Sequence, residues 1–151
     1  MTIEYREISA DKIDIIKPLW EQLNYHHMGI STNFKDSFLT RTFEERKKSL
    51  VAGNNKLKIF LAEDAELSKI IGYSISSIAG MNGEVDSIFV CEEYRGKGIG
   101  KEFMNRALDW FDNNKIVNVF INVLYENENA LKFYDNFRFV PRTFTLQRKY
   151  E

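Results

Sequence analysis

The chain has 151 residues, of which 44% are hydrophobic and 28% are charged, and its formal net charge is −1. This composition is typical of one globular domain, which we place over residues 1–151, and it excludes an intrinsically disordered chain. The near-zero net charge argues against general nucleic-acid binding, and no apolar run is long enough to span a membrane. The single cysteine, Cys91, rules out an internal disulfide and is compatible with a reducing compartment, so we expect a cytoplasmic protein.

The first half of the chain predicts one strand, two helices and two further strands. Pro18 lies inside the first helical pattern, so that helix kinks or restarts there. Thr42 and Glu45 match a capping box that begins the second helix, and Gly53 can end it. The expected elements are a strand over Thr2–Ile8, a helix capped by Ser9 or Asp11 and continuing to Leu23, an irregular segment over Tyr25–Phe38, a helix from Thr42, and strands over Lys56–Glu63 and Ile70–Ile78.

The most informative stretch is Glu84–Lys101, which predicts a strand, a glycine-rich turn and the start of a helix. Positions 85, 87, 89 and 91 are expected on one face of the strand, and positions 86, 88 and 90 on the other. The following helix, over Lys101–Asn114, has an apolar face made of Phe103, Met104, Ala107, Leu108 and Phe111. Glycines at a helix start leave main-chain N–H groups accessible, so this junction predicts a phosphate site.

The spacing of the glycines excludes two common phosphate sites. A P-loop needs Ser or Thr after the lysine, but Lys101 is followed by Glu102, which disfavours a nucleoside-triphosphate-binding module. The dinucleotide fingerprint would need a third glycine where the chain has Lys101. The pattern that fits is Arg-x-x-Gly-x-Gly, at Arg95, Gly98 and Gly100.

This pattern resembles the acetyl-coenzyme A signature of the GNAT family of N-acetyltransferases. A second stretch, Asn127–Phe139, is similar to the family's Asn-x-x-Ala-x-x-Phe/Leu-Tyr pattern, which usually continues to Gly-Phe. Here Arg138 stands where that glycine is common, and we expect Asn136 to take the left-handed conformation instead. The resemblance implies that acetyl-CoA, or coenzyme A, is bound as a cosubstrate by Phe89, Val90, Arg95, Gly96, Lys97, Gly98, Ile99, Gly100, Lys101, Asn127, Ala130 and Phe133.

The resemblance also predicts the fold class, an α/β protein with a mixed α+β sheet. The sheet would be mostly antiparallel, with one parallel strand pair that splays apart around the coenzyme, and about four helices would pack on it. The remaining expected elements are a strand over Ile116–Val123, a helix over Glu126–Asn136 and a closing strand or hairpin over Phe139–Tyr150. Relatives often pair through their C-terminal strands, which leaves a homodimer open.

The expected reaction moves an acetyl group from acetyl-CoA directly to a primary amine. An alkyl ammonium group has a pKa of about 10.4, so a base must take its proton. The resemblance makes Glu84 the preferred base, because it lies eleven positions before Arg95, where the histone-modifying branch of the family has its glutamate base. Asp86 is the alternative, since it is two residues on and so faces the same side of the strand. The resemblance makes Tyr134 the acid that protonates the departing thiolate, and a main-chain N–H near Val90 the oxyanion donor.

Several alternatives accompany this interpretation. A non-catalytic acyl-CoA sensor would use the same pocket without needing Glu84 or Tyr134. Cys91 is better explained as a small buried residue than as a nucleophile, because the sequence places no histidine beside it. His26 and His27 lack the further ligands of a metal site, so no metal is expected. The acceptor stays open between a small-molecule amine and a peptide or protein amine, with no nucleic-acid or membrane partner.

Overall fold

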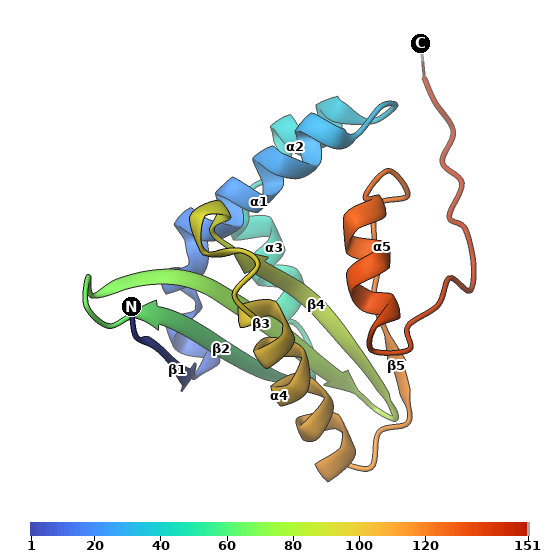
Figure 1. Ribbon diagram of the computed structural model, residues 1–151. Coiled ribbons are helices and arrows are strands. Elements are labelled where there is room, and N and C mark those ends of the chain that lie inside the picture. The colour runs from blue at the N-terminus through green and yellow to red at the C-terminus, as the bar shows by residue number, and fades with distance from the viewer. Residues whose placement is uncertain (151) are drawn as a thin grey trace.

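The computed structural model describes residues 1–150 as a five-stranded sheet with helices on both faces (Figure 1). The strands follow the order β1-β2-β3-β4-β5, in which the first four pair antiparallel and β5 pairs parallel with β4. The mixed sheet expected from the sequence is therefore confirmed. The strand bounds are β1 Ile3–Ile8, β2 Lys56–Asp64, β3 Lys69–Ala79, β4 Asn82–Val90 and β5 Asn118–Phe120.

Five α-helices and two short 3-10 helices accompany the sheet within residues 1–150, slightly more than expected. Pro18 lies in the first turn of α1, so the helix restarts there after η1. The hydroxyl of Thr42 accepts a hydrogen bond from the Glu45 amide (3.2 Å), which confirms the predicted start of α3. The segment expected to be irregular instead contains the end of α1 and the start of α2. The helix bounds are η1 Ala10–Ile16, α1 Lys17–Ile30, α2 Lys35–Thr40, α3 Phe43–Val51, η2 Glu92–Tyr94, α4 Ile99–Asn113 and α5 Glu128–Asp135.

Helix α4 packs closely against one face of the sheet, on the side toward the viewer in Figure 1. Its predicted apolar face supplies Phe103 and Phe111, both almost fully buried. Two strand glycines allow this approach: a Cβ at Gly83 would lie 2.5 Å from the Phe111 ring, and one at Gly72 would lie 3.2 Å from the Phe103 ring. The close contact fixes where the N-terminus of α4 lies relative to β4.

Strand β4 contains a bulge at Asp86. Val85 pairs with Ser76 and Ser87 pairs with Ile75, so one residue of β4 has no opposite partner. Because Ser76 and Ile75 point to opposite faces of β3, Val85 and Ser87 also lie on opposite faces. The unbroken alternation predicted for this strand is therefore wrong at Asp86, where the extra residue changes the phase.

The C-terminal part differs most from the prediction. The strand expected over Ile116–Val123 is reduced to the three residues of β5. The closing strand or hairpin expected over Phe139–Tyr150 is wrong, since residues 139–150 form no ladder with another described strand. A strand exists only where its main chain has a pairing partner, and this segment has none among the described strands. Figure 1 shows this segment running beside α5 and away from the sheet.

The end of α5 also corrects an expectation. Asn136 has ordinary helical angles (φ −60°), whereas Arg138 takes the left-handed conformation (φ +68°). The Phe139 amide donates to the Tyr134 carbonyl (3.2 Å), which closes the helix end around Arg138. The position where the resemblance would place glycine therefore keeps the left-handed geometry without glycine.

Candidate active site

The glycine-rich turn joins the end of η2 to the start of α4 and is open to a ligand. Gly96 and Gly98 have positive φ angles (+77° and +83°), which explains glycine at both positions. The first helical hydrogen bond of α4 runs from the Glu102 amide to the Gly98 carbonyl (3.0 Å), so the three amides before it have no acceptor inside the helix. A Cβ at Gly96 or Gly98 would meet no atom within 4 Å. Accessible amides at a helix N-terminus fit the diphosphate of coenzyme A.

The side chains of the turn have different roles. Arg95 folds back, donating from Nε to the Val90 carbonyl (2.8 Å) with its guanidinium over the Phe89 ring (5.5 Å). It therefore braces the link between β4 and the turn. The side chain of Ile99 is buried in the core, so this residue can offer a ligand only its main chain. Lys97 and Lys101 are exposed.

The gap predicted between β4 and β5 is present. The two strands pair only from Asn82 to Glu84 on β4, while β4 continues to Val90 (Figure 1). Helix α5 contacts the start of α4, because a Cβ at Gly100 would lie only 3.1 Å from Cζ of Phe133. Gly100 thus permits this contact, which places Phe133 next to the glycine-rich turn.

Glu84 and Asp86 lie together on β4, at and beside the bulge. Burial raises the pKa of Asp86 to about 6, and the neighbouring Glu84 charge adds to the rise while the Ser77 hydroxyl opposes it. The Oδ2 atom of Asp86 is buried and has no hydrogen-bond partner within the described residues. Glu84 accepts a long hydrogen bond from Asn122 (3.4 Å), close to where β5 ends. Asp86 is therefore a carboxylate with a free oxygen and an affinity for protons near neutral pH.

Tyr134 and Asn127 belong to α5. Burial raises the pKa of the Tyr134 phenol to about 12, and its ring makes an edge contact with Phe133 (5.2 Å between centroids). Asn127 is the N-cap of α5, because its side-chain oxygen accepts from the Ala130 amide (3.1 Å). The cap explains asparagine at position 127; it uses only the main chain of residue 130 and so does not by itself require alanine there.

Comparison with known proteins identifies the family. Residues 20–139, most of the chain, match the sequence model of the Acetyltransferase (GNAT) family. The chain belongs to this family. It is also 34% identical, over 82 residues, to the uncharacterized N-acetyltransferase YobR of Bacillus subtilis (strain 168). That match covers 54% of this chain but only 32% of the relative, so the chain spans about a third of that protein's length.

Solved structures agree on the fold. A tetramutant of the BH1408 protein from Bacillus halodurans superposes with a TM-score of 0.73 at 20% identity, covering 99% of this chain and 100% of the other. The PaiA N-acetyltransferase from Thermoplasma acidophilum, in complex with coenzyme A, superposes with a TM-score of 0.69 at 19% identity. The superposition covers 90% of this chain and 88% of the other. At these identities the likeness shows the GNAT fold and nothing finer.

One contact at the GNAT site could not be found from the sequence. The Glu126 carboxylate accepts from both the amide (2.7 Å) and the hydroxyl (2.8 Å) of Thr32. It links the α1–α2 loop to the loop before α5, directly beside Asn127. No local signal connects residues 94 positions apart, so only the fold reveals this bridge.

Burial also shifts the pKa values of two groups outside the Glu84–Asp86 pair, Cys91 and His27. Burial raises the pKa of the Cys91 thiol, which disfavours a reactive thiolate. Burial lowers the pKa of His27 to about 4. Across residues 1–150, His, Cys, Asp and Glu do not gather into a group of three or more that could hold a metal ion. Within the same range, every helix is too short or too polar to cross a membrane.

A separate pocket of about 490 Å³ lies among α1, α2 and the start of α3. Its walls include aromatic side chains, the acidic residues Glu21 and Glu44, and the basic residues Lys17 and Arg41. Arg46, one turn after Phe43 on α3, donates to the Asp86 carbonyl (3.3 Å). The first turn of α3 therefore contacts both the wall of this pocket and the bulge that carries Asp86.

Proposed function

We propose that this protein transfers the acetyl group of acetyl-CoA to a primary amine. The observation that supports this most is the open glycine-rich turn, whose free amides lie at the start of α4, next to the gap between β4 and β5. Family membership supports acetyl-CoA as the donor. Acetyl-CoA would supply the activated thioester, and the chain would bind it, orient it and move protons.

The amides from Gly96 to Lys101 would hold the diphosphate, with Arg95 keeping the turn attached to Val90. The unpaired edge of β4 beyond Glu84, with Phe89 and Val90, would hold the pantetheine arm and offer the oxyanion donor. Phe133, with Asn127 and Ala130 at the start of α5, would form the opposite wall.

The amine nitrogen would attack the thioester carbonyl, and its proton would pass to the Glu84–Asp86 pair, directly or through water. Asp86 suits this role better, because its raised pKa of about 6 is closer to neutral pH than an ordinary carboxyl. When the carbon–sulfur bond breaks, the thiolate would take a proton from Tyr134. The high pKa of Tyr134 keeps its phenol protonated over the working range, as a donor requires.

The pocket among α1, α2 and α3 is our candidate for the acceptor side. Its aromatic walls suit an alkyl chain or the face of an ammonium group, and Glu21 and Glu44 can pair with an ammonium group although Lys17 and Arg41 also line the pocket. Glu21→Gln and Glu44→Gln should raise the KM of a cationic amine without changing the Kd of coenzyme A. An unchanged amine KM in both variants would remove this pocket from the proposal.

The deciding experiment combines calorimetry with coenzyme A and a thiol-release assay over a panel of amines. Saturable binding with turnover on at least one primary amine is the expected result. Binding without turnover on any amine would favour the acyl-CoA sensor. Tyr134→Phe, Glu84→Gln and Asp86→Asn test the assigned roles, since each should slow turnover while leaving coenzyme A binding intact.

A further inference from the structure

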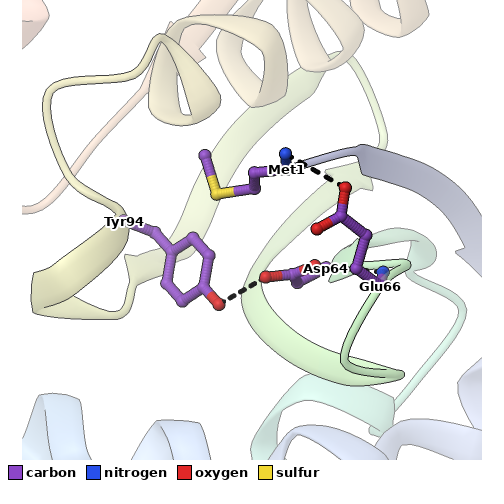
Figure 2. Close-up of polar contacts among 4 residues, drawn as sticks. All are labelled: Met1, Asp64, Glu66 and Tyr94. Carbon is purple, nitrogen blue, oxygen red and sulfur yellow. Dashed lines mark hydrogen bonds and ion pairs between the residues drawn. The ribbon is translucent and has the colours of Figure 1, made fainter.

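A buried hydrogen bond lies directly before the glycine-rich turn. Tyr94, the last residue of η2, donates from its hydroxyl to Oδ2 of Asp64 at 2.6 Å (Figure 2). Tyr94 and Asp64 are 7% and 4% exposed, so water competes little for this contact. Asp64 is the last residue of β2, 30 positions earlier in the chain. The bond therefore ties the segment before the turn to the β2–β3 connection.

The acceptor is itself held in place. Oδ1 of Asp64 accepts from the Glu66 amide (3.1 Å), and the Asp64 carbonyl accepts from the Leu67 amide (3.2 Å). The hydrogen bond from Tyr94 is the main reason that the pKa of Asp64 is lowered, and the same bond raises the pKa of Tyr94 to about 12. Figure 2 also shows Glu66 paired with the terminal amine of Met1 (3.1 Å), at an exposed site beyond this contact. Asp64 is thus a charged, fixed acceptor.

The other side-chain hydrogen bond that braces the turn, from Arg95 to the Val90 carbonyl, is exposed to solvent. A Cβ at Gly96 or Gly98 would meet no atom within 4 Å, so no other part of the protein covers the side-chain direction of either residue. On the helix side, Ile99 is buried in the core. On the strand side, Tyr94 is the buried side chain closest to the turn, while Arg95 is exposed. The open turn is therefore bracketed by two buried residues, Tyr94 and Ile99.

We propose that the Tyr94–Asp64 hydrogen bond positions the turn for the coenzyme diphosphate, which makes Tyr94 a positioning residue for acetyl-CoA. The proposal rests on the proposed function. A turn held from both sides keeps its amides aimed at the ligand before binding, so less ordering is required when the ligand arrives. Without the hydroxyl, the Tyr94 ring can stay buried while the link to Asp64 is lost.

The test compares Tyr94→Phe with the wild type and with the matched control Tyr73→Phe. Tyr73 is also buried and shares a hydrogen bond with Ser87 (2.7 Å), so its variant loses a similar bond away from the turn. Calorimetry with coenzyme A should show Kd raised about threefold to tenfold for Tyr94→Phe, as expected for one lost hydrogen bond. For Tyr73→Phe it should be unchanged. Pantetheine, which lacks the diphosphate, should bind wild type and Tyr94→Phe equally in an NMR titration.

Hydrogen exchange gives a second measurement. Tyr94→Phe should speed exchange of the amides over residues 92–98 and leave the β3 amides unchanged. An unchanged coenzyme A Kd in Tyr94→Phe would overturn the proposal, as would an equal loss of pantetheine binding. If the wild type itself does not bind coenzyme A, the proposed function fails and this inference fails with it.

Discussion

The raised pKa of Asp86 predicts an acid limb in the turnover rate. The base must be ionised to accept a proton, and burial holds the pKa of Asp86 at about 6. At pH 5 about 9% of such a group is ionised, and at pH 7 about 91%, so kcat should rise about tenfold between these values. An ordinary aspartate, with a pKa near 3.9, would be ionised throughout and give a nearly flat profile.

The measurement is kcat at saturating amine and acetyl-CoA from pH 4.5 to 8, since kcat reports ionisation in the bound complex. Asp86→Asn should lower the rate and remove the limb. Glu84→Gln should keep the limb and move it to lower pH, because the Glu84 charge helps to raise the Asp86 pKa. A wild-type kcat that does not change between pH 5 and 7, or a limb that persists in Asp86→Asn, would refute Asp86 as the base.

The same shift has a consequence for stability. Folded Asp86 binds a proton more tightly than the unfolded chain does, so between about pH 4 and pH 6 the free energy of unfolding should fall as pH rises. Asp86→Asn removes a partly buried charge and should stabilise the protein at pH 7 by about 1–2 kcal/mol. This free energy is smaller than the full pKa shift corresponds to, because solvent screens a partly exposed charge. Denaturant unfolding of both proteins at pH 4 and pH 7 checks this, and a variant less stable at both pH values would contradict it.

Three further predictions concern the turn, the core and the loop bridge. Gly98→Ala forces a residue with a side chain into a positive φ (+83°) and should destabilise the protein by about 1–2 kcal/mol in thermal unfolding. Calorimetry should show weaker coenzyme A binding to the same variant. Unaltered binding would show that the turn does not contact the ligand. Gly83→Ala places a Cβ 2.5 Å from the Phe111 ring and should cost about 1–3 kcal/mol in denaturant unfolding, and an equally stable variant would mean that α4 can move away freely. Glu126→Ala should speed amide hydrogen exchange in the α1–α2 loop, because Glu126 holds that loop through its hydrogen bonds with Thr32. Glu128→Ala is the control. Equal exchange in both variants would show that the bridge does not order the loop.

The sequence predicted what depends on local chemistry. Apolar spacing gave helix α4 because its buried face repeats with the helical period, and Thr42 marked the start of α3 because a helix N-terminus needs a side-chain acceptor. The glycines of the turn were informative for the same reason, since a positive φ at Gly96 and Gly98 is a local requirement. Their spacing, with the second motif, was enough to indicate the family.

Tertiary structure decided what depends on partners distant in the chain. The bulge at Asp86 exists because β4 must match the register of β3, and no periodicity in β4 alone records it. Residues 139–150 pair with no described strand, because pairing depends on an available edge rather than on local sequence. The buried link from Tyr94 to Asp64 and the bridge from Glu126 to Thr32 each join segments at least 30 positions apart. Composition and spacing thus identified the glycine-rich turn that we propose as the coenzyme site, and three-dimensional packing determined which charges lie near it and which contacts hold it in place.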